Sequence, residues 1–261
     1  MIDQLKNIRC YMLDMDGTFY LGEKLLPGAL EFMDYLREND LDYLFLTNNS
    51  SKHAGLYAQK IRKLGYNVPE EKIFTSGEAT AIYLNQLKPA ARIYLVGTTA
   101  LEDEFQKHGF VLTDQNPDYA VLGFDTSITY EKIWKFCDFL RAGKPYIATH
   151  PDFNCPTENG FMPDIGSFMA MIEASTGRKP DVVIGKPQAH IVNAVVEKTG
   201  YSLDQIAMIG DRLYTDIALG QAGIKTILVL SGETKPEDLI GSNFQPDIIM
   251  EDLGDLVRKL K

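Results

Sequence analysis

The chain has 261 residues, of which 45% are hydrophobic and 24% are charged, and these values are typical of a globular protein with a large core. Its 36 acidic residues outnumber its 26 basic ones, which gives a formal net charge of -10, and no cluster of Lys and Arg stands out. Polymeric nucleic acid is therefore not an expected partner.

Cysteine usage and hydropathy exclude further classes of protein. Cys10, Cys137 and Cys155 are widely spaced and form no C-x-x-C pair, which argues against a disulfide framework and against a zinc site. No apolar stretch approaches the ~20 residues that cross a bilayer, and the N-terminal segment lacks the pattern of a signal peptide. We therefore expect a cytoplasmic protein that does not span a membrane.

The first predicted element is a short buried strand, Tyr11–Leu13, that stops at two acidic residues, Asp14 and Asp16. Residues i and i+2 of an extended chain point the same way, so the two carboxylates begin on one side of the strand end. Such a pair typically binds a cation or divides its work between an ionised and a protonated group, although a D-x-D-G turn can also be purely structural. Phe19 and Leu25 stand where a calcium-binding EF-hand loop needs Gly and Glu, and no G-x-G-x-x-G follows the strand, so calcium and dinucleotide sites are not expected.

Strands and helices then alternate along the chain. Continuous apolar strands that alternate with helices predict an α/β fold with a doubly wound parallel sheet, covered on both faces. The predicted strands after the first are 41–47, 93–97, 119–124, 146–149, 182–185, 206–210, 226–230 and 247–250, and the predicted helices include 29–39, 52–64, 101–108, 130–140, 167–176, 191–199 and 216–222. The segment from about residue 76 has the pattern of a separate, smaller α/β module. We therefore predict a discontinuous core domain, 1–78 and 182–261, with an inserted domain at 79–181.

Four predicted core strands end in polar or charged residues. In open parallel α/β sheets the ligand crevice lies beyond the carboxyl ends of the strands, so these side chains are expected to meet. Carboxylates are ligands that suit Mg²⁺, while a hydroxyl, turn N–H groups and a lysine suit a phosphate. The residues are Asp14 and Asp16, Thr47 and Asn48, Lys186, and Asp211 with Asp216. Together they predict a magnesium and phosphate site.

Several of these residues also have simpler explanations. Thr47 and Asn48 are good helix N-caps, and capping is compatible with phosphate binding. Asp216 can complement a helix N-terminus or orient the metal site through its neighbours. Gly17 is interpreted as a requirement of backbone geometry.

Residues of the insert are interpreted as structural. His150, Asp152 and Asn154 are expected to be turn residues, and Trp134, Phe136, Met169 and Met171 are expected to pack in the core.

The motifs resemble those of the haloacid dehalogenase-like (HAD) phosphohydrolases. DMDGT at 14–18, TNN at 47–49, GKP at 185–187 and GDRLYTD at 210–216 occur in the family's order. The large insert, its ATHPD segment and the phrase GRKPDVVIGKP are similar to the NagD-type branch, which includes 4-nitrophenylphosphatases and phosphoglycolate phosphatases. This resemblance implies a Rossmann-like core with an α/β cap that decides substrate specificity.

The resemblance also implies a role for each motif residue. Asp14 would be the nucleophile that forms an aspartyl-phosphate, and Asp16 the general acid and base. Asp14, the backbone carbonyl of Asp16, and Asp211 would hold Mg²⁺, with Asp216 behind these ligands. The phosphoryl group would be bound by Thr47, Asn48 and Lys186.

The expected function is that of a magnesium-dependent phosphatase acting on small organic phosphate monoesters. A phosphotransferase or phosphomutase would use the same intermediate, and a non-catalytic protein that binds a phosphorylated ligand is a third hypothesis. The last ranks below the others because Asp14, Asp16, Lys186 and Asp211 are all intact. The expected partner is a small phosphorylated metabolite, and since caps of this type can supply dimer contacts, a homodimer and a monomer both agree with the sequence.

Overall fold

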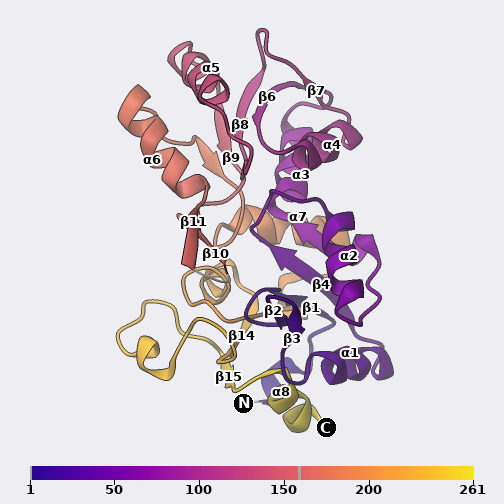
Figure 1. The fold of residues 1–261 in the computed structure, drawn as a ribbon. Coiled ribbons are helices and arrows are strands. Elements are labelled where there is room, and N and C mark those ends of the chain that lie inside the picture. The colour runs from indigo at the N-terminus through magenta and orange to yellow at the C-terminus, as the bar shows by residue number, and fades with distance from the viewer. Residues whose placement is uncertain (1, 158–159) are drawn as a thin grey trace. The chain divides into compact units, whose positions relative to one another are not determined.

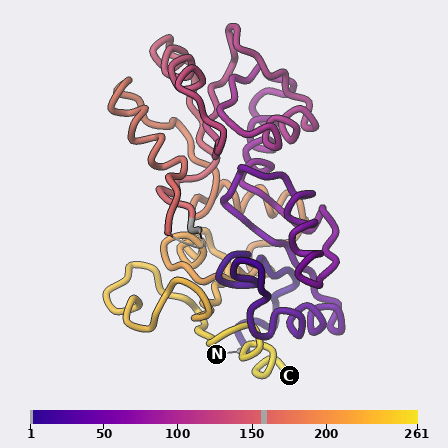
Figure 2. Tube along the Cα trace, viewed as in Figure 1, coloured from indigo at the N-terminus to yellow at the C-terminus, as the bar shows by residue number. Residues whose placement is uncertain are grey.

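The computed structural model describes residues 2–157 and 160–261, which form two compact units. The first unit comprises Met1–Thr47, Tyr57–Phe74 and Lys186–Lys261, and the second comprises Asn48–Leu56 and Thr75–Gly185. The colours of Figure 2 show the same division, with both ends of the chain in one unit and the middle in the other. Compactness is not the same property as independent folding, so the domain limits at 78/79 and 181/182 stay a prediction.

The first unit is built on a six-stranded sheet with the order β15-β14-β13-β1-β4-β5. The strands are β1 (Cys10–Leu13), β4 (Asp42–Thr47), β5 (Ile73–Thr75), β13 (Ile206–Gly210), β14 (Lys225–Val229) and β15 (Ile248–Met250). β1 is central and fully buried, and it pairs in parallel with β13 on one side and with β4 on the other. Leu13 is in register with Ile209 and with Phe45, so the residues that follow these three strands leave the sheet at one edge.

Helices and a short hairpin complete this unit. The α-helices are α1 (Ala29–Glu38), α2 (Ala54–Lys63), α7 (Ala189–Thr199) and α8 (Leu253–Leu260), although the start of α2, up to Leu56, is counted in the second unit. Helix α1 packs beside α8 (Figure 1). The hairpin is formed by β2 (Tyr20–Leu21) and β3 (Lys24–Leu25). The 3-10 helices are η1 (Ile2–Leu5), η2 (Glu70–Lys72), η3 (Leu203–Gln205), η4 (Ile217–Ala222) and η5 (Pro236–Leu239). The predicted α-helix 216–222 is thus the 3-10 helix η4, because six residues that include Gly220 favour an α-helix too weakly.

The second unit contains a five-stranded sheet with the order β12-β9-β8-β6-β7, whose strand pairs are parallel. Its strands are β6 (Arg92–Val96), β7 (Val111–Leu112), β8 (Tyr119–Leu122), β9 (Tyr146–Ala148) and β12 (Val182–Val183), and an antiparallel hairpin is formed by β10 (Asn154–Thr157) and β11 (Gly160–Pro163). Its helices are α3 (Ser76–Leu87), α4 (Thr99–Lys107), α5 (Tyr130–Arg141) and α6 (Ile165–Thr176). Parallel sheets flanked by helices confirm the predicted α/β class with a Rossmann-like core.

One strand lies in a different sheet from the predicted one. The run 182–185 was expected to be a strand of the core sheet, but Val182 and Val183 form β12, which pairs with β9 at the edge of the second unit's sheet. A short apolar run has the same pattern in either sheet, so periodicity cannot assign it. Lys186 therefore follows a strand of the other unit.

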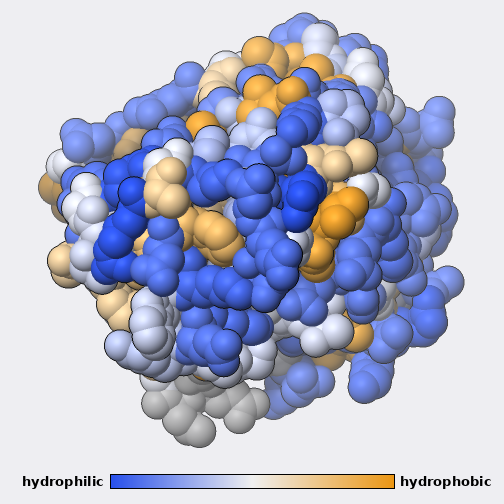
Figure 3. All heavy atoms as spheres, turned by 90° about the horizontal axis from the view of Figure 1, so that it is seen from above, coloured by the Kyte–Doolittle hydropathy of each residue, from blue (hydrophilic) through white to orange (hydrophobic). Residues whose placement is uncertain are grey.

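Two apolar residues of the second unit lie on the surface instead of in the core. Phe136 is fully buried as expected, whereas Trp134 is 60% and Met171 46% exposed. Hydrophilic residues predominate on the face drawn in Figure 3, and its apolar residues form separate small groups. Scattered apolar side chains of this kind are ordinary at a protein surface.

Among the described helices, none has the length and apolar character needed to cross a membrane.

Candidate active site

The two predicted catalytic carboxylates follow β1 directly. The N–H of Asp14 donates to the carbonyl of Ile209 at 2.9 Å, which continues the sheet pairing by one residue and fixes the start of the turn. The Asp14 side chain is 14% exposed and that of Asp16 is 56% exposed. One carboxylate is thus held at the protein interior and the other faces solvent.

Lys186 joins two of the acidic residues. Its Nζ donates to Oδ1 of Asp14 at 2.5 Å, to Oδ1 of Asp216 at 2.7 Å and to the carbonyl of Leu46 at 3.3 Å. Burial alone would lower the pKa of Lys186, but Asp14 and Asp216 outweigh it and raise the pKa, so the ammonium stays charged. The cation is fixed between β1, β4 and the segment after β13.

Asp211 follows β13 in a space that two glycines leave open. Its Oδ2 accepts from the N–H of Glu233 at 2.7 Å, and its Oδ1 accepts from the Thr18 hydroxyl at 3.4 Å. A Cβ atom would lie 2.4 Å from Oδ2 at Gly17 and 2.0 Å from it at Gly232. The close packing of Asp211 therefore depends on glycine at both positions.

Asp216 is fully buried beneath these groups. Besides its ion pair with Lys186, its Oδ2 accepts from the N–H of Arg212 at 3.1 Å. Burial raises its pKa to about 6, with Lys186 acting against the rise and Asp14 adding to it. Its contacts suit a residue that holds Lys186 and the turn after β13 in place.

The acidic group fits a divalent cation. Ligand atoms of Asp14, Asp211 and Asp216 all lie within 4.8 Å of one another. The pKa of Asp211 is raised to about 8, first by burial and then by repulsion from Asp14 and Asp216. The raised pKa means that the ionised form of Asp211 is disfavoured, so the site lacks positive charge. A hard divalent cation bound to these carboxylate oxygens would supply that charge.

The predicted phosphate-binding residues after β4 fall on both sides of the boundary between the units. Thr47 is the last residue of β4, is 8% exposed, and lies in the first unit with Asp14 and Lys186. Asn48 belongs to the second unit, where its Nδ2 donates to both carboxylate oxygens of Asp152 at 3.2 Å. Within the first unit the fold thus brings together Asp14, Lys186, Asp211 and Asp216, with Asp16 in the turn after β1 and Thr47 at the end of the neighbouring strand β4.

Besides the backbone groups of Arg212 and Glu233, the side chains of Thr18, Tyr20 and Lys60 contact the acidic residues, and sequence reasoning overlooked them. Thr18 bonds Asp211, while Tyr20 and Lys60 contact Asp16. Thr18 belongs to the DMDGT motif, so the motif itself was a signal for it. Lys60 lies more than forty residues from Asp16 on a helix, where its charge looks like that of any solvated helical lysine.

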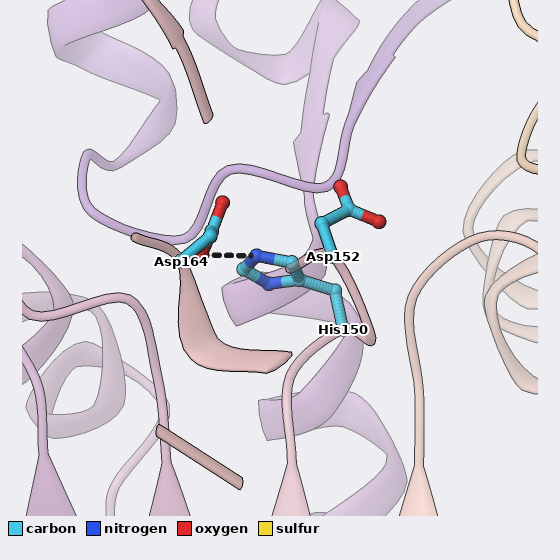
Figure 4. Close-up of side chains that lie close together, drawn as sticks. All are labelled: His150, Asp152 and Asp164. Atoms are coloured by element: carbon cyan, nitrogen blue, oxygen red, sulfur yellow. Dashed lines mark hydrogen bonds and ion pairs between the residues drawn. The ribbon is translucent and has the colours of Figure 1, made fainter. Parts of the chain in front are cut away.

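A second group of possible metal ligands, His150, Asp152 and Asp164, lies in the second unit (Figure 4). His150 is fully buried, and its Nε2 is 3.0 Å from Oδ1 of Asp164. Because a carboxylate accepts hydrogen bonds, Nε2 donates, and Nδ1 accepts from the Thr149 hydroxyl at 3.0 Å. Figure 4 shows the Asp152 carboxylate turned away from the ring. Both ring nitrogens are therefore hydrogen-bonded, so His150 joins Thr149 and Asp164 in one buried network.

The network continues into the segment after β4. Ser50 Oγ lies 2.9 Å from the Thr149 hydroxyl and accepts from the N–H of Phe124 at 2.9 Å. His150 was expected to be a structural turn residue; it lies in the loop after β9 and is also the buried link between this segment and Asp164, the N-cap of α6. A histidine in a loop sequence carries no sign of such burial.

Comparisons with known proteins agree with this fold and site. A model of the haloacid dehalogenase-like hydrolases matches residues 11–111, and a HAD-hydrolase-like model matches residues 183–256. The acid sugar phosphatase of Staphylococcus aureus (strain MRSA252) is 34% identical over 259 residues, which cover 98% of this chain and 100% of that protein.

Solved structures give the same result. The crystal structure of a 4-nitrophenylphosphatase from Thermotoga maritima has a TM-score of 0.96 and 50% identity, with 99% of each chain covered. NagD from E. coli K-12 has a TM-score of 0.89 and 34% identity, with 95% of this chain and 98% of that chain covered.

A Rossmann-like core with acidic residues at its strand ends, matched by family models over most of its length, defines a hydrolase. The chain belongs to the haloacid dehalogenase-like hydrolases. Within them, the predicted NagD-type branch, with its 4-nitrophenylphosphatases, is confirmed.

Proposed function

We propose that this protein is a magnesium-dependent phosphatase that hydrolyses small organic phosphate monoesters through an aspartyl-phosphate on Asp14. The predicted enzyme class, a HAD-type phosphatase and therefore a phosphoric monoester hydrolase, is confirmed by the relatives. The observation that carries the mechanism is the ion pair of Asp14 with Lys186, 2.5 Å long and only slightly exposed. It leaves a carboxylate beside a fixed cation, which is what a nucleophile for an anionic ester requires.

Each step is assigned to a residue of the chain. A carboxylate oxygen of Asp14 attacks phosphorus, the bond to the ester oxygen breaks, and Asp16 protonates the departing alcohol. Water then attacks phosphorus, gives a proton to Asp16, and Asp14 leaves as a carboxylate. Lys186 and Thr47, with Asn48, bind the phosphoryl oxygens.

Asp14, the carbonyl of Asp16, and Asp211 would hold Mg²⁺, with Asp216 positioning Lys186 behind them. The ion would neutralise charge on the phosphoryl oxygens. The donor set of oxygen atoms and the raised pKa of Asp211 support this assignment.

The substrate class is proposed from the names of the relatives. Relatives are an acid sugar phosphatase and 4-nitrophenylphosphatases, so sugar phosphates and 4-nitrophenyl phosphate are the first compounds to test. We assign substrate choice to the inserted cap, 79–181, and propose a cytoplasmic location, consistent with three free cysteines.

The test measures phosphate release from sugar phosphates, 4-nitrophenyl phosphate, nucleoside monophosphates, phosphoglycolate and pyridoxal phosphate, with Mg²⁺ and with a chelator. Asp14→Asn should reduce release by at least about 10³-fold, as loss of an entire covalent route does. Asp138→Asn changes an exposed carboxylate that forms an ion pair with Arg141, far along the sequence from the site residues, and it should retain activity. Acid quenching should trap phosphate on the peptide that contains Asp14.

Other outcomes point to the alternative functions. Release of 4-nitrophenol that needs an added acceptor alcohol, with the phosphoryl group recovered on that alcohol instead of as inorganic phosphate, would favour a phosphotransferase. Tight binding of esters with no release would favour the non-catalytic hypothesis. Unchanged release by Asp14→Asn would contradict the nucleophile assignment.

A further inference from the structure

Asp16 is the most exposed of the acidic site residues, yet both of its oxygens have a partner. The Tyr20 hydroxyl donates to Oδ2 at 3.3 Å, and Lys60 Nζ lies 3.8 Å from Oδ1. The same Nζ lies 3.9 Å from the centre of the Tyr20 ring. The three side chains therefore form a closed triangle, all within the first unit.

Two of the three corners are firmly placed. Tyr20 is fully buried at the start of β2, its N–H donates to the Met15 carbonyl at 3.0 Å, and its carbonyl accepts from the N–H of Gly17 at 2.8 Å. Lys60 belongs to α2, and its side chain is 26% exposed. A buried ring tied to the same turn and a cation from a helix thus act on one solvent-facing carboxylate.

Stability is a poor explanation for the contact between Lys60 and Asp16. A long ion pair with a carboxylate that is more than half exposed contributes little to folding, because water screens it. The contacts do, however, reduce the rotational freedom of the carboxyl group. An exposed aspartate without them would sample several rotamers.

We propose that Tyr20 and Lys60 are positioning residues that hold the Asp16 carboxyl group in the orientation from which it protonates the leaving oxygen of the ester. This inference rests on the proposed function, since it needs Asp16 to be the general acid. Both residues act through Asp16.

The step gives a prediction that depends on the leaving group. When the P–O bond breaks, its electron pair goes to the ester oxygen. An alkoxide is too basic to depart without the proton of Asp16, whereas 4-nitrophenolate is stable as an anion and departs without it. Misplacing Asp16 should therefore slow alkyl esters and spare the nitrophenyl ester.

The experiment compares kcat/KM for 2-glycerol phosphate and for 4-nitrophenyl phosphate in Tyr20→Phe, Lys60→Met and Asp16→Asn. We use kcat/KM because it reports only the steps up to and including transfer of the phosphoryl group to Asp14. The later hydrolysis of the aspartyl-phosphate, which is the same for both esters, does not affect it. Tyr20→Phe and Lys60→Met should each lower kcat/KM for the alkyl ester by about 10- to 100-fold, because misplacing the general acid loses part of the rate that the acid supplies. The kcat/KM for the nitrophenyl ester should fall by less than about threefold.

Matched controls are available in the same unit. Tyr66→Phe removes a hydroxyl that bonds Tyr43, and Lys63→Met removes a lysine from the same helix as Lys60. Neither should change the ratio of the two kcat/KM values. Circular dichroism and thermal unfolding establish that each variant is folded, and Lys60→Met tests the idea even where Tyr20→Phe does not fold.

The outcomes separate this inference from the proposed function. If Tyr20→Phe and Lys60→Met lower kcat/KM equally for both esters, or not at all, the positioning role is overturned. If Asp16→Asn still lowers kcat/KM for the alkyl ester alone, the role of Asp16 as general acid stands nevertheless. A wild-type protein that hydrolyses neither ester, with Mg²⁺ present, would overturn both.

Discussion

Gly17 is the residue at which backbone geometry and site electrostatics meet. Its φ of +92° lies where L side chains are strained, and its missing Cβ gives Asp211 its space. Gly65 has a similar φ of +103°, but nothing lies within 4 Å of the Cβ it lacks. Substitutions at Gly17 and Gly65 therefore separate the effect of backbone strain, which both share, from the displacement of Asp211, which only Gly17 can cause.

Both Gly17→Ala and Gly65→Ala should lower the free energy of unfolding by about 1–2 kcal/mol, the cost of a left-handed conformation with a side chain. Gly17→Ala should in addition displace Asp211, reduce kcat/KM on the order of 10²-fold, and raise the Mg²⁺ concentration for half-maximal phosphate release. Urea unfolding and a Mg²⁺ titration of activity measure the two effects. Equal losses of activity in the two variants would show that the clash with Asp211 does not matter.

At the scale of elements, Asp164 has two tasks in the second unit. Its side chain accepts from the N–H of Ile165 at 2.6 Å as the N-cap of α6, and from buried His150. Thr129 caps α5 by accepting from the N–H of Lys132 at 3.2 Å. Thr129 therefore offers a cap of the same unit without a histidine partner.

Asp164→Ala should lower the free energy of unfolding by about 2–4 kcal/mol, because it removes a cap worth about 1 kcal/mol and leaves a buried imidazole N–H without an acceptor. Asp164→Asn keeps an oxygen acceptor and should cost less, and Thr129→Ala should cost about 1 kcal/mol. Urea unfolding with equal m-values tests the order. A cost for Asp164→Ala no greater than that for Thr129→Ala would mean that the bond to His150 contributes nothing.

The core strands were accessible to sequence reasoning because the apolar runs at β1, β4 and β13 end in polar motif residues. Periodicity could not assign β12 to its sheet, and it gave no sign of α3 or α8. The triangle of Asp16, Tyr20 and Lys60 joins distant residues through side chains, and no local pattern records such contacts. The roles of the seven predicted site residues stay predictions, and Asp14→Asn and Asp16→Asn test two of them directly.

At the scale of the whole molecule, the chain passes between the two units four times, after Thr47, Leu56, Phe74 and Gly185. Residues 48–56 belong to the second unit, where Ser50 bonds Phe124 and Thr149 and the Thr98 hydroxyl donates to the Ser51 carbonyl at 2.7 Å. The predicted domain 79–181 lacks this segment and also β12. It therefore omits partners of buried polar groups.

A fragment of residues 48–185 should unfold cooperatively at a higher urea concentration than a fragment of 79–181. The shorter fragment deprives the Phe124 N–H, the Thr149 hydroxyl and the Thr98 hydroxyl of the partners that Ser50 and Ser51 supply, and each lost bond costs about 1–3 kcal/mol when the group is buried. Ser50→Ala in the longer fragment should lower its unfolding midpoint part of the way towards that of the shorter fragment. Equal midpoints for the two fragments would support the narrower domain limits instead.

The order of residues in the two units bears on synthesis at the ribosome. Everything in the second unit precedes residue 186, whereas β13, β14 and β15 come after it. A nascent chain can therefore finish its middle part while β1 still waits for β13, with one edge of that strand open to other chains or to a chaperone. Synthesis of β13 closes that edge, and the acidic cluster can assemble only afterwards, because Asp211 and Asp216 follow β13 in the chain.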